Sequence, residues 1–235
     1  NKMATLGEMA TGVAHELNQP LAAIQMVADF FHRRLDGKQL PDEESLRAMA
    51  VKLTSNAERA SRIINHMREF GRKSNLAASA VQVNDVITKS LDFFSQQLKI
   101  KDIHVVLELE QSLPLIKADP NRLEQVFINL LINARDAIEE KQRQSPDLRH
   151  EKRIEIRTRS KRRTVLAEVR DTGTGIPKNI MQRLFEPFFT TKKVGKGTGL
   201  GLSISYGIVT DYGGTIHTNS REGEGTCFSI KFPRN

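Results

Sequence analysis

The sequence EQVFINLLINARDA, residues 124–137, has the pattern of a helix with an apolar face turned to a core. Asn129 and Asn133 are four residues apart and therefore share another face of that helix. Amide oxygens are suitable ligands for Mg²⁺, which keeps several waters and prefers to be shared with phosphates. Asparagine pairs are common on helix surfaces, so the segment alone allows a metal site without requiring one.

The residues before this segment indicate where its helix begins. Asp119 is a typical N-cap and Pro120 fits the first helical position, so we expect a helix through Glu140. The other predicted elements are helices at 84–99, with Asn84 as N-cap, and 202–211, and strands at 103–109, 154–158, 165–170, 215–218 and 227–232. This order predicts a mixed α/β layer, with one mixed sheet and helices on one of its faces.

The segment Asp171–Pro177, DTGTGIP, directly follows a predicted strand. Glycines at this spacing let the backbone approach a flat ligand, and an ionised aspartate accepts a hydrogen bond from an exocyclic amine such as that of adenine. A tight Asp-Gly turn with no ligand explains the same residues. On this segment alone, the turn is the safer interpretation.

The segment Gly195–Ser203, GKGTGLGLS, is glycine-rich and opens a predicted helix. Amide groups at a helix N-terminus can bind phosphate, and the nearby Lys192, Lys193 and Lys196 add positive charge. The spacing matches neither a Walker loop nor a dinucleotide-binding fingerprint. Glycine richness also fits a mobile loop without a ligand, so this segment too leaves two interpretations open.

The N-terminal part has a different pattern. Residues 6–35 and 46–70 carry apolar side chains at alternating steps of three and four, which predicts two long helices of coiled-coil character. Gly and Pro within Asp36–Asp42 break the pattern, and Gly71 ends the second helix. A lone antiparallel hairpin leaves much apolar surface in water, whereas two hairpins form a four-helix bundle. We therefore expect a homodimer and, for the whole chain, an α+β fold.

The composition indicates a folded protein of a reducing compartment. The 235 residues are 38% hydrophobic, and the single cysteine, Cys227, cannot form an internal disulfide. We find neither a run of about 18 apolar residues nor a signal-peptide pattern. The expected location is therefore the cytoplasm, with no membrane span in this chain.

A net charge of +8 raises nucleic acid as a partner. The densest basic run is residues 152–163, KRIEIRTRSKRR, where alternation predicts a half-exposed strand with a turn at Ser160-Lys161. Tryptophan is absent and only two tyrosines occur, so the stacking platforms of single-strand binders are missing. We favour a solvated basic hairpin and expect no nucleic-acid partner.

Five segments in order resemble the sequence boxes of sensor histidine kinases of two-component systems. They are residues 12–24 (GVAHELNQPLAAI, the H box), 129–137 (the N box), 171–177 (the first glycine box), 184–189 (LFEPFF, the F box) and 197–201 (the second glycine box). The resemblance covers nearly the whole chain, and five ordered boxes are highly specific. HELNQPL together with SISYGIV at 203–209 is most similar to kinases that sense oxygen or dicarboxylates.

The resemblance implies a domain organisation and a set of ligands. Residues 1–74 form the dimerisation and phosphotransfer domain, 75–80 a linker, and 81–235 a Bergerat-type ATP-binding α/β sandwich. Asn133, supported by Asn129, binds Mg²⁺; Asp171 recognises adenine; and 186–198 forms a lid over the triphosphate. The residues expected at the ATP site are Asn129, Asn133, Asp136, Asp171, Gly173, Gly175, Lys192, Lys196, Gly197, Thr198, Gly199, Leu200, Gly201 and Thr226.

His15 is the expected phosphoacceptor. On a helix it lies about 200° beyond Val13 and is turned away from the apolar stripe, so we expect it to be exposed. No second His or Cys occurs at ligand spacing for a metal site. By resemblance, Glu16 is the base that takes a proton from the imidazole as its other nitrogen attacks the γ-phosphate. The phosphoryl group then passes to an aspartate of a response-regulator receiver domain.

Two alternatives to a histidine kinase remain, and the sequence departs from the family's pattern at one position. Related ATPases of the same fold carry a glutamate base where this chain has Asn129, and an amide cannot take a proton from water, which argues against a hydrolase. A catalytically degenerate, nucleotide-binding dimeric scaffold is the other alternative, although every box residue needed for the chemistry is present. Many histidine kinases carry Thr or Asn where this chain has Gln19, which puts phosphatase activity in doubt. The sensing part is expected upstream of His15 or in another chain.

Overall fold

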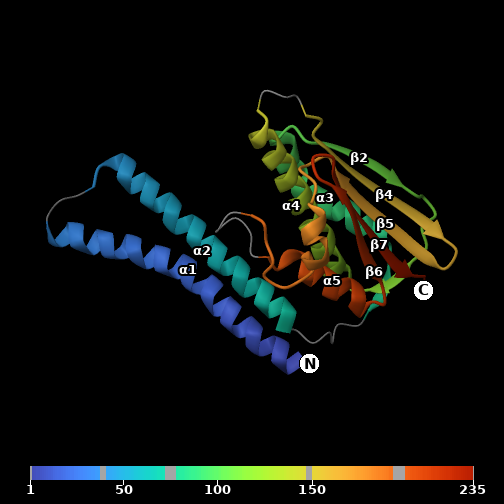
Figure 1. Ribbon diagram of the computed structural model, residues 1–235, viewed down its shortest axis with the longest axis horizontal. Coiled ribbons are helices and arrows are strands. Elements are labelled where there is room, and N and C mark those ends of the chain that lie inside the picture. The colour runs from blue at the N-terminus through green and yellow to red at the C-terminus, as the bar shows by residue number, and fades with distance from the viewer. Residues whose placement is uncertain (1, 38–40, 72–77, 147–149, 193–198, 235) are drawn as a thin grey trace. The chain divides into compact units, whose positions relative to one another are not determined.

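A computed structural model describes residues 2–37, 41–71, 78–146, 150–192 and 199–234 of the chain (Figure 1). The chain divides into two compact units. One contains Asn1–Lys73 and Pro187–Leu200, and the other contains Ser74–Glu186 and Gly201–Asn235.

The first unit contains the predicted helical hairpin. Helices α1 (Lys2–Asp36) and α2 (Glu43–Gly71) pack against each other. The α-helical assignment of α1 continues through Pro20, although proline removes one internal hydrogen bond. Asp42 precedes α2, and its carboxylate accepts a hydrogen bond from the Ser45 amide at 2.7 Å, which lowers the pKa of Asp42. This acceptor explains why α2 begins three residues before Leu46, the first apolar residue of the predicted helix.

The second unit is built on a five-stranded mixed sheet, as predicted. Its strands, in spatial order, are β2 (His104–Leu109), β4 (Arg153–Lys161), β5 (Thr164–Asp171), β7 (Gly225–Pro233) and β6 (Thr215–Arg221). Strands β2 and β4 run parallel, whereas the other neighbours are antiparallel. A separate two-stranded sheet pairs β1 (Ser79–Val81) with β3 (Ile116–Ala118) and was not predicted.

Three α-helices cover one face of the large sheet (Figure 1). They are α3 (Val83–Ile100), α4 (Pro120–Gln144) and α5 (Gly201–Asp211). A short 3₁₀ helix, η1 (Lys178–Arg183), lies between β5 and α5 in the chain. Helix α4 packs against β4, β5 and β7. The largest fully buried side chains are those of Ile87, Leu98, Ile116, Leu123, Phe127, Leu130, Leu131, Ile154, Ile156, Ile230 and Phe232.

Helix α4 begins as predicted. Asp119 is its N-cap, and Pro120 occupies the first helical position. The Oδ1 atom of Asp119 accepts hydrogen bonds from the amides of Asn121 at 2.8 Å and Arg122 at 3.1 Å. Two of the amide groups that a helix N-terminus leaves without partners are thereby satisfied by a side chain that is itself buried.

Three local predictions were wrong. Gln82, not Asn84, is the N-cap of α3; Asn84 instead donates to the carbonyl of Glu110 at 2.9 Å. Ser79 and Ala80, predicted as part of the linker, lie in β1, because they pair with β3. The basic run does form a hairpin of β4 and β5, but its turn is at Arg162-Arg163 rather than Ser160-Lys161, because pairing continues to Lys161 and Thr164.

We predict that Asp119→Ala lowers the free energy of unfolding by about 1–2 kcal/mol, because two amides of α4 lose their acceptor. Asp119→Asn keeps an acceptor oxygen at the same place and should retain most of the stability. Urea unfolding followed by circular dichroism measures both. An asparagine variant as unstable as the alanine variant would show that capping does not explain the effect.

Candidate functional site

Asp171 lies at the end of β5 in a row of residues that faces the helices. Along β5, Val165, Ala167, Val169 and Asp171 are buried, because alternate residues of a strand point to the same face. Asp171 pairs with Ile154 of β4 on one side and Thr226 of β7 on the other, and both are also buried. The strand period thus places one carboxylate at the edge of an apolar core.

The two oxygens of the Asp171 carboxylate have different surroundings. Oδ1 accepts hydrogen bonds from the amides of Gly173 at 2.8 Å and Thr226 at 3.3 Å. Among the described residues, none donates a hydrogen bond to Oδ2. Burial raises the pKa of Asp171 from 3.8 to about 6, although these two hydrogen bonds and the charge of Lys141 oppose the rise. The carboxylate is therefore ionised at neutral pH, held through one oxygen, with the other left for a ligand.

The glycines after Asp171 are required by the protein itself. A Cβ atom on Gly173 would lie 2.5 Å from the Cβ of Ala137 in α4. Gly175 has a φ of +68°, and a Cβ there would lie 2.0 Å from the carbonyl oxygen of Arg221. The Thr174 amide donates to the carbonyl of Ala137 at 3.2 Å, so the segment lies directly on α4. These contacts explain both glycines without a ligand.

Ser220 joins this segment to the β6–β7 hairpin. Its Oγ accepts a hydrogen bond from the Ile176 amide at 2.8 Å and donates to the carbonyl of Gly225 at 2.8 Å. It also lies 2.9 Å from Oγ1 of Thr226. With its only hydrogen directed to Gly225, Ser220 accepts from Thr226, which leaves the Thr226 oxygen as an acceptor. Sequence reasoning missed Ser220, because only the register of β6 and β7 places it opposite Thr226.

The asparagine pair lies on α4, in the same unit as Asp171. Asn129 is buried, and its Nδ2 donates to the carbonyl of Gly201 at 3.0 Å and to Oγ of Ser205 at 3.3 Å. Asn133 follows one turn later and is half-buried. The structure thus brings together Asn129 and Gly201, the first residue of α5, which were both expected at the ATP site.

Asp136 has a partner within α4. Its Oδ1 lies 2.7 Å from Nη2 and 3.0 Å from Nε of Arg135, and the ion pair neutralises much of its charge. Asp136 lies three residues after Asn133 and thus near the asparagine face of the helix.

The remaining expected site residues fall into two groups. Lys192, Gly199 and Leu200 are described; Gly199 has a φ of +66°, and a Cβ there would lie 2.3 Å from the backbone of Phe188, so glycine is required. Lys196, Gly197 and Thr198 lie outside the described residues.

The backbone of His15 and Glu16 lies in α1, but their side chains lie outside the description, so the expected exposure of His15 stays a prediction.

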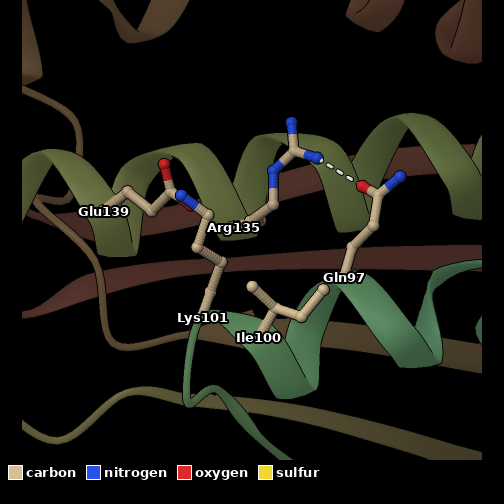
Figure 2. Close-up of a pocket in the computed structure, with 5 residues that line it drawn as sticks. All are labelled: Gln97, Ile100, Lys101, Arg135 and Glu139. Carbon is tan, nitrogen blue, oxygen red and sulfur yellow. Dashed lines mark hydrogen bonds and ion pairs between the residues drawn. The ribbon is translucent and has the colours of Figure 1, made fainter.

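A pocket of about 390 Å³ opens between α3 and α4 (Figure 2). It is lined by Gln97, Ile100, Lys101, Arg135 and Glu139, none of which belongs to the expected ATP site. Arg135 reaches across to Gln97, with a hydrogen bond of 2.9 Å. Both cations in its wall pair with carboxylates, Lys101 with Glu139 at 3.1 Å and Arg135 with Asp136. The two cations of this pocket are therefore already paired within the protein.

Comparison with known families agrees with this arrangement. The family described as histidine kinase-, DNA gyrase B- and HSP90-like ATPase matches residues 118–235. The His Kinase A (phospho-acceptor) domain matches residues 5–76. The chain belongs to the sensor histidine kinases, as its five boxes implied.

Individual relatives support the same assignment. The sensor kinase CckA of Brucella abortus (strain 2308) is 38% identical over 241 residues, which cover 99% of this chain and 25% of that protein. The sensor histidine kinase ZraS of Escherichia coli (strain K12) is 34% identical over 234 residues, covering 100% of this chain and 47% of that protein. The chain thus spans between a quarter and a half of these curated relatives.

A solved structure matches the whole chain. Histidine kinase ThkA in complex with the response regulator protein TrrA aligns with a TM-score of 0.76 at 28% identity, covering 100% of this chain and 63% of that one. Among the described residues, no helix combines the length and apolar character that crossing a bilayer requires.

We predict that Asp171→Asn stabilises the fold at high pH and not at low pH. Below pH 3.8 the Asp171 carboxyl is protonated in both the folded and the unfolded chain, so it resembles the neutral asparagine of the variant. As the pH rises from 3.8 through about 6, the unfolded chain loses this proton more readily than the folded one, so the parent protein loses stability and the variant does not. At about 1.4 kcal/mol per pKa unit, the variant should gain about 2–3 kcal/mol over the parent between pH 4 and pH 8.

Chemical denaturation at several pH values measures this difference. Asp92→Asn, at an exposed position of α3, is the matched control, because it removes the same charge without a buried site. A difference between Asp171→Asn and the parent that stays constant with pH would contradict the assigned cause.

Proposed function

We propose that this chain is the phosphoacceptor and ATP-binding core of a sensor histidine kinase. It transfers the γ-phosphoryl group of ATP to His15 and then to an aspartate of a response-regulator receiver domain. The observation that carries the proposal is the ionised, half-satisfied carboxylate of Asp171 in the same unit as the Asn129 and Asn133 pair. One chain joins this unit to a phosphoacceptor-type helical domain.

Asp171 has the properties of an adenine-recognition residue. Oδ2 can accept a hydrogen bond from the exocyclic amine, while Oδ1 is held by the amides of Gly173 and Thr226. The hydroxyl oxygen of Thr226, acting as an acceptor beside Ser220, offers a second polar group at the same end of the site. Because these groups are held by backbone contacts, little is lost in ordering them when ATP binds.

The residues present also fit a magnesium ion. Asn129 and Asn133 offer neutral amide oxygens, and the Asp136 charge is already offset by Arg135. A site of this kind suits Mg²⁺ shared with phosphates, because the phosphates supply the negative charge. When bound, the ion offsets charge on the transferring phosphoryl group. Lys192, with Lys196 and the amides of Gly197, Thr198, Gly199, Leu200 and Gly201, would bind the phosphates.

His15 is the proposed nucleophile and Glu16 its base. Glu16 takes a proton from one imidazole nitrogen while the other forms the N–P bond; the bond between the γ-phosphorus and the bridging oxygen breaks, and ADP leaves. The phosphoramidate then passes its phosphoryl group to the receiver aspartate. The complex between ThkA and TrrA supports a response regulator as the partner of this chain.

Two alternatives receive less support. Asn129 uses its Nδ2 on Gly201 and Ser205 and carries no base, so it cannot activate water for hydrolysis. A catalytically degenerate scaffold that still binds nucleotide would also keep Asp171. The kinase is favoured over it because the chain also carries His15 and Glu16 and matches the phospho-acceptor domain.

The helical hairpin supports a homodimer. Leu21, Met26, Leu46, Val51 and Ile64 are between 40% and 65% exposed in the single chain. A second hairpin would cover such residues in a four-helix bundle.

We keep 1–74 as the phosphotransfer domain and begin the ATP-binding domain no later than Ser79, where β1 starts, instead of residue 81. The single cysteine is consistent with the cytoplasm as its location.

The proposal predicts that γ-labelled ATP and Mg²⁺ give the protein an acid-labile, base-stable label. His15→Gln should abolish the label, because the nucleophilic nitrogen is missing. His32→Gln, an exposed position on the same helix, is the matched control and should be labelled normally. No label on the parent protein, or full label on His15→Gln, would overturn the assignment.

A second prediction concerns pH. If adenine's amine donates to ionised Asp171, ATP binding should be about tenfold weaker at pH 5 than at pH 7, because the pKa of Asp171 is about 6 and the protonated form must first lose its proton. Titration calorimetry measures the affinity. Inosine triphosphate, which has a carbonyl oxygen in place of the amine, is the control and should bind weakly without this pH dependence. Equal binding of the two nucleotides would contradict the role of Asp171.

A further inference from the structure

The amide of Asn129 has a determined orientation. Its Nδ2 lies 3.0 Å from the carbonyl oxygen of Gly201 and 3.3 Å from Oγ of Ser205. A backbone carbonyl can only accept a hydrogen bond, so the atom that faces Gly201 must be the amide nitrogen. The oxygen therefore points away from α5. Among the described residues, none donates a hydrogen bond to Oδ1.

Ser205 accounts for the second hydrogen of the same amide. Its hydroxyl donates to the carbonyl of Gly201 at 2.9 Å, and with its only hydrogen used there, its oxygen accepts from Asn129. If the amide turned over, its oxygen would face the carbonyl oxygen of Gly201, which has no hydrogen, and Ser205 could donate to it only by giving up its own hydrogen bond to Gly201. Both hydrogen bonds of Nδ2 would be lost, and two acceptors would be brought together.

We propose that Ser205 is a positioning residue. Together with the Gly201 carbonyl, it holds the nitrogen of the Asn129 amide against α5, so that the amide oxygen, on the opposite side, is available to a Mg²⁺ ion that binds with ATP. The inference rests on the proposed function, since it assigns a role in binding Mg²⁺ with ATP. Ser205 is fully buried on α5 and acts only through Asn129, 76 residues away in the chain. The start of α5, at Gly201, thereby sets which atom of α4 is offered to the cation.

Ser90 provides a matched control. It is also fully buried in a helix, and its hydroxyl donates to the carbonyl four residues earlier, that of Val86, at 2.8 Å. Ser205 makes the equivalent bond to Gly201 and has, in addition, the contact with Asn129. Replacing either serine by alanine removes the same kind of buried hydroxyl, whereas only Ser205→Ala also removes one of the two acceptors that hold the Asn129 amide.

The test measures binding of ADP to the 235-residue chain by titration calorimetry, once with Mg²⁺ and once with EDTA. Mg²⁺ should raise the affinity for ADP in the parent protein, and the ratio of the affinities with Mg²⁺ and with EDTA should be about three- to tenfold smaller in Ser205→Ala. This is the size expected for loss of one orienting hydrogen bond. Its affinity in EDTA should match that of the parent. Ser90→Ala should leave both affinities unchanged, and Ser205→Thr, which keeps the oxygen, should restore the Mg²⁺ effect.

Three results would overturn the inference. The first is an Mg²⁺ effect in Ser205→Ala that equals that of the parent. The second is an equal loss of affinity for ADP in Ser205→Ala with and without Mg²⁺, which would indicate that Ser205 contributes packing alone. The third is the same change in the Mg²⁺ effect in Ser90→Ala as in Ser205→Ala. If the parent protein binds no ADP under either condition, the proposed function itself fails, and the inference fails with it. Circular dichroism of each variant shows that the compared proteins are folded.

Discussion

The close packing of the segment after β5 on helix α4 is the contact on which the rest of the ATP-binding unit depends. It is possible because Gly173 has no side chain where one would overlap Ala137, and it is held by the hydrogen bond from Thr174 to Ala137. Lys141, one turn further along α4, donates to the carbonyl of Thr172 at 3.0 Å. One end of the site comes from β5 and the other from α4, so this contact sets the position of Asp171 relative to the asparagine pair.

Two side chains of the site are oriented in the same way. Asp171 is held through Oδ1 by backbone amides, and Asn129 is held through Nδ2 by a backbone carbonyl and by Ser205. Each is left with one acceptor oxygen whose direction is set before any ligand binds. The arrangement has an energetic cost at Asp171, because its carboxylate lies in a row of apolar residues and its pKa is raised by burial. The hydrogen bonds from the amides of Gly173 and Thr226 offset part of this cost.

Much of the fold could be predicted because its signals are local. The apolar steps of the two hairpin helices, the Asp119 cap and the alternating strands each depend on neighbouring residues, and all are present. The failures involve partners far apart. Strand β1 has three residues and exists because Ser79–Val81 pairs with Ile116–Ala118. The turn of the basic hairpin moved because the register of β4 and β5 extends pairing beyond Ser160.

The sequence by itself determined the class of protein, the order of its boxes, the face that Asn129 and Asn133 share, and the candidate nucleophile His15. These follow from spacing along one helix or loop. Only the tertiary structure decided that Asp171 is buried and titrates near pH 6, that Gly173 is needed for contact with α4, and that Ser205 orients Asn129. The reason is physical: burial, strand register and hydrogen bonds between distant segments arise only when those segments pack together, and no local pattern records them.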